Sequence, residues 1–376
     1  MRVLLMSITA GQGHHATAQA LEARFHELGH SCTTVDTLEY ASPILKEMVD
    51  KGYLVSTAYM PKAFGKVYHF ADRKTTPAHR MSMTNLTSHI LTHELRDFID
   101  DCAPDIIVCT HPFPAVIIDS LKRKDRLDAI TVGVLTDFTI HPFWENTQHL
   151  DYYVTASELM GIQLRRKHLD DAKMLPFGIP IHPKFSTKMD QREARRALGL
   201  AEDKKTLLVM SGSMGFGKID RSIEKLDELD MDFQGLVVCG NNKEMYRKIS
   251  AMELHKDFRI FGYVNNVDVM MDAADCIITK PGGITSSEAL AKELPMIMVN
   301  PIPGQEERNV EFLLNNQLAM YATRTYPVDE AVYTLFGDGF HLENLRRNIR
   351  ELGKKNASQR ICDFLVERVM EKKQHK

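Results

Sequence analysis

Two glycines, three hydroxyl side chains and a carboxylate follow a short apolar run in the last third of the chain. Cys276–Thr279 predicts a buried strand, and the Gly-Gly turn at residues 280–283 leads into a helix. Thr285 or Ser286 is predicted to cap that helix, with Glu288 in its first turn. Such a turn leaves backbone N–H groups at the positive end of the helix dipole, which favours phosphate. Glu288 would then accept hydrogen bonds from ribose hydroxyls.

A second polar group lies one strand further on, after the apolar run at residues 296–300. Gln305, Glu306 and Asn309 open another helix, and their amides and carboxylate suit a polyhydroxylated sugar. Ligands of open α/β sheets bind where the strands end, so both groups together predict a nucleotide-sugar site. Taken alone, a strand followed by a Gly turn is more often an ordinary structural turn than a ligand site.

The N-terminus offers a different nucleotide motif. Residues 2–8 predict a strand, which is followed by Gly11-x-Gly13-x-x-Ala16 and, twenty positions later, Asp36. This spacing fits the dinucleotide-binding fingerprint, so an NAD-dependent oxidoreductase is an alternative. Two consecutive histidines in the same loop argue against it, because a bound pyrophosphate requires close approach of the backbone.

Residues 258–321 resemble the donor half of GT-B glycosyltransferases that add sugars to membrane diacylglycerol. These are the plant-type monogalactosyldiacylglycerol synthases and the bacterial processive diacylglycerol glucosyltransferases, which belong to glycosyltransferase family 28. The motifs Phe261-Gly-Tyr-Val264, Ile277-Ile-Thr-Lys-Pro-Gly-Gly-Ile-Thr285 and Pro303-Gly-Gln-Glu306 support the likeness, which extends over nearly the whole chain. The chain is more distantly similar to the N-acetylglucosaminyltransferase that makes the lipid-linked peptidoglycan precursor.

The resemblance implies catalytic roles for two residues of the N-terminal half. His14 matches the histidine of the family's Gly-x-Gly-His loop, and an imidazole suits the removal of a proton from an acceptor hydroxyl. A helix N-terminus disfavours the imidazolium, which would keep His14 neutral. Asp137 would orient His14 or share its role, whereas His111 is a less favoured candidate. Alternatively, His14 caps the helix or contacts the diphosphate, and His15 is structural.

The donor phosphates are expected at a second Gly-rich turn. Residues 211–218 nearly fit a P-loop, but Ile219 stands where a Mg²⁺-binding hydroxyl is needed, which excludes an ATPase. At His182 the family usually has arginine, so either His182 is protonated in the complex or Lys184 or Lys218 helps. Uracil is expected at the strand end near Phe261, although Phe261 and Tyr263 could pack in the core instead. The donor-binding residues implied are Gly13, His182, Ser213, Gly215, Gly217, Phe261, Tyr263, Val264, Gly282, Gly283, Ile284, Thr285, Glu288, Gln305, Glu306 and Asn309.

Composition narrows the class of protein. The 376 residues are 44% hydrophobic and 26% charged, and this length suits two folded domains. A net charge of −3, without a dense Lys/Arg run, argues against a nucleic-acid partner. The six scattered cysteines contain no C-x-x-C pair, which predicts reduced thiols and neither a disulfide framework nor a zinc site. No apolar run approaches the roughly 18 residues that span a bilayer, and residues 3–10 are too short for a signal peptide.

The segment at residues 40–90 combines aromatic side chains and methionines with basic charge. Between residues 46 and 80 it has seven Lys/Arg against three acids, which suits an anionic bilayer surface. A pair of core-packing helices with a solvated face is the alternative. Membrane contact is expected at Tyr59, Phe64 and Lys66. Trp144, the single tryptophan, is either an interfacial anchor or a core residue.

Alternating strands and helices predict an α/β fold of the GT-B type, in which two Rossmann-like, doubly wound domains face a cleft. We expect residues 1–180 to bind the acceptor, residues 181–355 to bind the UDP-sugar, and a helix at 356–376 to cross back to the first domain. The Pro- and Gly-rich residues 177–185 form the expected linker.

The resemblance implies inverting transfer of a hexose from a UDP-sugar to the 3-hydroxyl of diacylglycerol. No metal, cofactor or obligate protein partner is expected. The protein would then be cytoplasmic and peripheral on the inner face of the cell membrane. An oxidoreductase, or transfer of N-acetylglucosamine to a polyprenyl-linked acceptor, is the alternative.

Overall fold

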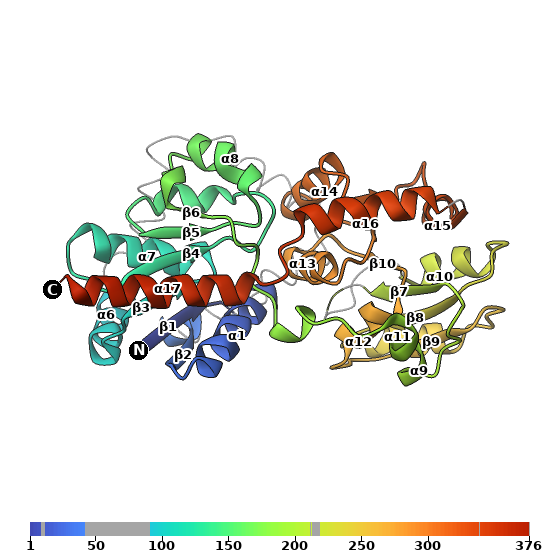
Figure 1. The fold of residues 1–376 in the computed structure, drawn as a ribbon, viewed down its shortest axis with the longest axis horizontal. Helices are drawn as coiled ribbons and strands as arrows, with labels where there is room; N and C mark the ends of the chain where they lie inside the picture. Colours follow the sequence, from blue (N-terminus) through green and yellow to red (C-terminus); the bar gives the residue numbers. More distant parts are fainter. Residues whose placement is uncertain (9–11, 42–90, 211, 213–218, 338, 376) are drawn as a thin grey trace. The chain divides into compact units, whose positions relative to one another are not determined.

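The computed structural model describes residues 1–8, 12–41, 91–210, 212, 219–337 and 339–375. The chain divides into two compact units (Figure 1). The first comprises Met1–Pro183, Pro303–Gln305 and Asn356–Lys376, and the second comprises Lys184–Ile302 and Glu306–Lys355. Within the described ranges no helix is both long and apolar enough to cross a bilayer.

The first unit is built on a six-stranded sheet in the order β2-β1-β3-β4-β5-β6, and every neighbouring pair is parallel. Parallel strands buried on both faces are largely apolar, as β3 and β4 are. All six carboxyl ends therefore lie along one edge of the sheet. The strands are β1 (Arg2–Ser7), β2 (Ser31–Asp36), β3 (Ile106–Cys109), β4 (Ile130–Val134), β5 (Tyr152–Val154) and β6 (Met174–Leu175).

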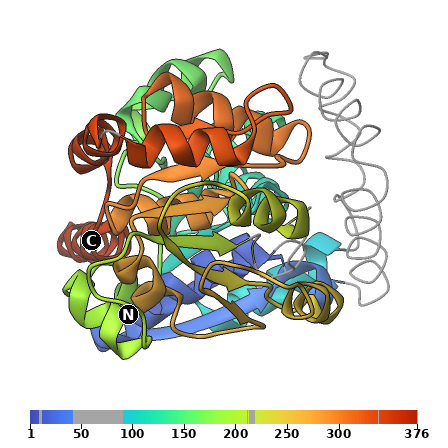
Figure 2. The ribbon, with the colours of Figure 1, turned by 90° about the vertical axis from the view of Figure 1, so that its right-hand side faces the viewer.

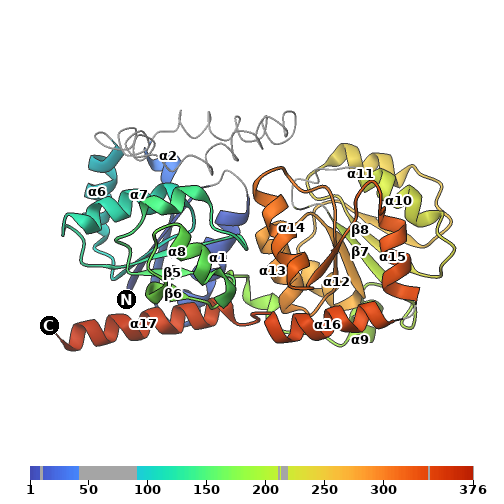
Figure 3. The same cartoon turned by 90° about the horizontal axis from the view of Figure 1, so that it is seen from above.

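Helices cover both faces of this sheet. Seen from above, α17 lies on one side of it and α7 on the other (Figure 3). The helices are α1 (Gln12–Glu27), α2 (Thr37–Ala41), α6 (Leu91–Cys102), α7 (Pro112–Arg123), α8 (Gly161–Arg166) and α17 (Ala357–Gln374). Short 3₁₀ turns are η1 (Pro142–Asn146), η2 (Glu158–Met160), η3 (Asp171–Lys173) and η4 (Pro183–Phe185), the last of which joins the two units in sequence.

The last helix, α17, contributes to the core of the first unit. One apolar stripe at helical spacing packs with α1 and the strands, through Ala357, Ile361, Cys362, Leu365 and Val369.

Two ion pairs hold the end of α17 to the first unit. Lys372 pairs with Asp128 at 2.8 Å and Lys373 with Asp105 at 2.7 Å. Residues 356 onward are therefore an integral layer of this unit.

The second unit repeats the plan with the strand order β12-β11-β10-β7-β8-β9, again all parallel. Figure 2 views this unit, with helices on both sides of its strands. The strands are β7 (Thr206–Met210), β8 (Gln234–Val238), β9 (Phe258–Phe261), β10 (Cys276–Thr279), β11 (Met296–Met298) and β12 (Ala319–Tyr321). The helices are α9 (Gln191–Ala197), α10 (Ile219–Asp227), α11 (Lys243–Ser250), α12 (Val267–Ala273), α13 (Gly283–Ala291), α14 (Gln305–Asn315), α15 (Val328–Gly337) and α16 (Phe340–Leu352).

The prediction of two doubly wound α/β sheets is confirmed. Each sheet places its first strand (β1 or β7) inside and its later strands on both sides, which makes a topological switch point at the carboxyl edge. That edge is where the candidate residues of each unit were expected.

Candidate functional site

His14 occupies the first turn of α1, beyond the carboxyl end of β1. Its Nδ1 lies 2.7 Å from the carbonyl oxygen of Thr110 and 3.1 Å from Oγ1 of Thr136. Because a carbonyl oxygen can only accept, Nδ1 must carry the hydrogen, and Nε2 keeps a lone pair. The residues after β3 and β4 thus fix the ring as a neutral imidazole with its hydrogen on Nδ1 and its lone pair on Nε2.

The surroundings of His14 favour its neutral form. Burial lowers the pKa of His14, while the negative charge of Asp137 and the hydrogen bond to Thr110 raise it again in part. Thr136 supplies the side-chain hydrogen bond to Nδ1, and the catalytic role of Asp137 stays a prediction. Asp137 acts on His14 through its charge, which would stabilise the imidazolium formed when Nε2 takes a proton.

Two further histidines follow β3 and β4, and both cap helices that begin with proline. His111 Nδ1 accepts the N–H of Phe113 at 3.0 Å, and His141 Nδ1 accepts the N–H of Phe143 at 3.3 Å. The rings of His14 and His111 lie with their centroids 4.7 Å apart in an edge-to-face arrangement. Burial, with the nearby charges of His14 and His141, holds the pKa of His111 well below its ordinary value.

In the second unit the Gly-Gly turn leads directly into α13. The predicted cap at Thr285 or Ser286 is wrong, because the helix begins at Gly283 with Gly282 as its N-cap and no side chain caps it. The first intrahelical bond runs from the Ser286 N–H to the Gly282 carbonyl at 3.0 Å. The N–H groups of Gly283, Ile284 and Thr285 precede that bond, and no described residue accepts from them.

Glu288 follows on the same helix, in its second turn, and its side chain is half-buried. Burial raises the pKa of Glu288 to about 8, against the charge of Lys184, and Asp268 adds to the increase. Carboxyl groups with a strongly raised pKa are often found at binding sites, and this one suits a ligand that donates hydrogen bonds.

The residues expected to bind the sugar have clear partners within the protein. Glu306 Oε1 lies 3.3 Å from Lys280 Nζ, and its Oε2 accepts the Ile302 N–H at 2.7 Å. Asn309 is fully buried and donates to the carbonyl of Pro281 at 2.9 Å. Asn309 therefore holds the turn before α13 in place, and Lys280 joins the polar group although the sequence prediction left it out.

The remaining predicted donor residues differ in exposure. Tyr263 is 64% exposed, so core packing does not explain it, whereas Phe261 and Val264 are half-buried at the end of β9. His182 is exposed, and Lys184 pairs with Asp268 at 3.1 Å. Gly13 is the second residue of α1, and Gln305 is the first residue of α14. Ser213, Gly215, Gly217 and Lys218 lie outside the described residues, as do Tyr59, Phe64 and Lys66.

Trp144 is a core residue and not an exposed anchor. Its side chain is 3% exposed, and a Cβ added to Gly133 would meet its ring at 2.6 Å. The indole ring therefore packs against β4 at a position where a residue larger than glycine would clash with it.

Asp36 has a structural role at the end of β2. Its Oδ1 accepts the N–H groups of Leu38 and Glu39 at 3.0 and 3.2 Å, so it caps the following turn. A dinucleotide-binding loop would use this carboxylate for ribose hydroxyls.

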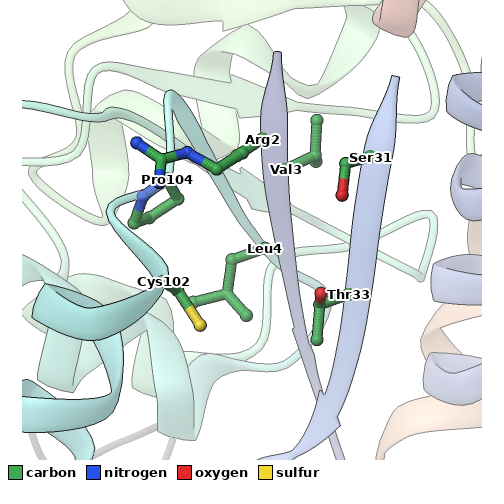
Figure 4. A pocket seen from close by; sticks show the side chains of 7 residues that line it. All are labelled: Arg2, Val3, Leu4, Ser31, Thr33, Cys102 and Pro104. Carbon is green, nitrogen blue, oxygen red and sulfur yellow. The ribbon is translucent and has the colours of Figure 1, made fainter. Parts of the chain in front are cut away.

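A small pocket lies at the opposite edge of the first sheet (Figure 4). The pocket lies at the amino ends of β1 and β2. Its lining residues are Arg2, Val3, Leu4, Ser31, Thr33, Cys102 and Pro104. Ligands of parallel sheets bind at the carboxyl edge, so this pocket is not the candidate site. In the described part of the chain no three His, Cys, Asp or Glu side chains gather as metal ligands.

Comparison with known proteins agrees with this architecture. Residues 14–181 match the monogalactosyldiacylglycerol (MGDG) synthase family, and residues 206–360 match the glycosyltransferase family 28 C-terminal domain. A crystal structure of MurG from Acinetobacter baumannii has a TM-score of 0.62 at 12% identity, covering 97% of this chain and 99% of that one. Alr3699/HepE of Anabaena, crystallised with UDP, has a TM-score of 0.56 at 13% identity and covers 100% of both chains.

The fold and these matches define a glycosyltransferase of the GT-B class. A processive diacylglycerol beta-glucosyltransferase of Bacillus subtilis (strain 168) is 30% identical over 368 residues, which are 97% of this chain and 94% of the relative. The chain belongs to this family of lipid glycosyltransferases, and the predicted resemblance and fold class are confirmed.

Proposed function

We propose that the protein transfers a hexose from a UDP-sugar to the 3-hydroxyl of diacylglycerol, with inversion, and so makes a membrane glycolipid. The relative from Bacillus subtilis is named for a diacylglycerol acceptor, and this chain aligns with it over nearly its whole length. The observation that most supports the proposal is the tautomer of His14, whose Nδ1 is held by the Thr110 carbonyl while Nε2 stays free to accept a proton.

In the proposed reaction His14 Nε2 removes the proton of the acceptor hydroxyl. The hydroxyl oxygen then attacks the anomeric carbon of the sugar, and the bond from that carbon to the diphosphate breaks on the opposite side. The charge of Asp137 offsets the positive charge that His14 acquires. Because the new bond forms on the face opposite the bond that breaks, the configuration at the anomeric carbon is inverted.

The donor is assigned to the second unit. The free N–H groups of Gly283, Ile284 and Thr285, at the positive end of α13, suit the diphosphate and its charge as it departs. Glu288, on the same helix, would accept hydrogen bonds from the ribose hydroxyls. Glu306, held between Lys280 and the backbone, presents a fixed carboxylate to the sugar.

A diacylglycerol acceptor requires access to a membrane, so we assign the protein to the inner face of the cell membrane as a peripheral enzyme. We also propose that transfer needs no metal ion, because His14 suits the role of the base and the N–H groups at the start of α13 suit the diphosphate, and we expect transfer to continue in the presence of EDTA.

A product analysis tests the proposal. UDP-glucose, UDP-galactose and UDP-N-acetylglucosamine are each offered with vesicles that contain diacylglycerol, and the lipid products are separated. We expect a hexosyl-diacylglycerol, lost by at least about 10²-fold in His14→Ala. His15→Ala is the matched control, because the His15 ring contacts the side chain of Gln19, one turn further along α1, at 3.2 Å. Full activity of His14→Ala, or no lipid product from any donor, would refute the proposal.

A further inference from the structure

Hydrogen bonding fixes the tautomer of His111 as it does that of His14, but the hydrogen is on the other ring nitrogen. Pro112 has no N–H, so the first free donor of α7 is the N–H of Phe113, and His111 Nδ1 accepts it at 3.0 Å. A neutral imidazole has one N–H, so in His111 the hydrogen must be on Nε2. In His14 it is on Nδ1, bound to Thr110.

The two neighbouring rings therefore present complementary nitrogens. His14 offers an acceptor at Nε2 and His111 a donor at Nε2, and the ring centroids are 4.7 Å apart. Both rings are half-buried at the carboxyl edge of the first sheet, and no described residue hydrogen-bonds either Nε2. Nε2 of His111 therefore remains available to a ligand while Nδ1 caps α7.

The surroundings keep His111 a neutral donor. The titratable groups beside it are His14 on α1 and His141 at the start of η1, and both disfavour a positive charge on it; Asp137 acts on His14. When His14 takes a proton, its new charge disfavours protonation of His111 further. His111 can therefore donate a hydrogen bond without competing for the proton that His14 removes.

We propose that His111 binds the acceptor, with Nε2–H donating to a glycerol or ester oxygen adjacent to the hydroxyl that His14 deprotonates. In this arrangement the acceptor proton moves to His14 Nε2 and His111 keeps its own. The hydrogen bond directs one oxygen of the glycerolipid to His111 and the reacting hydroxyl to His14. The inference rests on the proposed function, since it assumes a glycerolipid acceptor in the first unit.

Replacing His111 by a better helix cap separates this role from capping. His111→Ser and His111→Asp both keep an oxygen that can accept the Phe113 N–H, so the melting temperature should not fall. If His111 only caps α7, both variants retain wild-type kinetics. We expect kcat/KM for diacylglycerol to fall about tenfold or more in both, while KM for the UDP-sugar stays unchanged.

His141→Ser is the matched control, because it removes the other histidine cap of the same pattern. We expect its acceptor kcat/KM to change less than threefold. The proposal is overturned if His111→Ser and His111→Asp lie within twofold of wild type, or if KM for the donor rises as much as KM for the acceptor. It is also overturned if only variants with a lowered melting temperature lose activity.

Direct binding separates this inference from the proposed function. Titration calorimetry with dioctanoylglycerol, without donor, should show binding to the wild type that is about tenfold weaker in His111→Ser. That result supports the inference even if no sugar is transferred. Absence of binding to the wild type, or equal binding to both proteins, refutes it.

Discussion

We expect the second unit to become less stable as the pH rises, and we expect Glu288→Gln to remove most of that decrease. The pKa of Glu288 is about 8 in the folded protein against an ordinary 4.5, so the folded state holds a proton that the unfolded state releases. The stabilising effect is complete below pH 4.5 and is lost as the pH rises through 8. The glutamine variant has no such proton and should not follow this trend.

The size of the effect follows from the two pKa values. A difference of roughly 3.5 pKa units corresponds to about 5 kcal/mol, of which roughly 4 kcal/mol is lost between pH 5 and pH 9. Glu288 is only half-buried, and solvent screening reduces this to about 2–4 kcal/mol. Relative to wild type, Glu288→Gln should therefore gain about 2–4 kcal/mol between these two pH values.

Urea unfolding of both proteins at pH 5, 7 and 9, followed by circular dichroism, measures the difference. Glu330→Gln, at an exposed position on α15, is the control and should stay within about 0.5 kcal/mol of wild type at each pH. If wild type and Glu288→Gln instead respond to pH in parallel, Glu288 is not the buried acid that the structure indicates.

Three further substitutions test the packing around the sites. Lys292→Ala should destabilise the second unit by about 3–5 kcal/mol in urea unfolding, because it leaves Asp272, its partner at 2.6 Å, buried without a counter-charge. Gly133→Ala should cost about 1–3 kcal/mol and alter the fluorescence of Trp144, since the new methyl group would meet the indole at 2.6 Å. Asn309→Ala should lower the melting temperature by the equivalent of about 1–3 kcal/mol and weaken UDP binding in calorimetry, because the turn before α13 loses its tie to α14.

The strands were predictable because their signal is local. Short apolar runs bounded by turn residues identified Cys276–Thr279 with the bounds that the structure has, and those at residues 2–8 and 296–300 end within two residues of the observed strands. The edge strand Met174–Leu175 was missed, since two residues give no periodicity to detect.

Features that depend on distant residues could not be predicted from local patterns. The partner that fixes the tautomer of His14 is the backbone carbonyl of a residue 96 positions away, which leaves no trace in the sequence. Thr285 and Ser286 have the chemistry of helix caps, yet α13 starts at Gly283 and does without one. Trp144 was ambiguous because its burial depends on the absence of a side chain at Gly133.

The membership of α17 in the first unit sets an order for folding during synthesis. After Pro183 the ribosome must add the whole second unit before it reaches Asn356, which takes about 10–30 s at 5–20 residues per second. Throughout that interval the face of the first sheet that α17 will cover stays exposed to water and to other nascent chains. The first unit therefore begins to form first but completes its fold only after the second unit has been synthesised. Slow translation or release would prolong the period in which the first unit can aggregate.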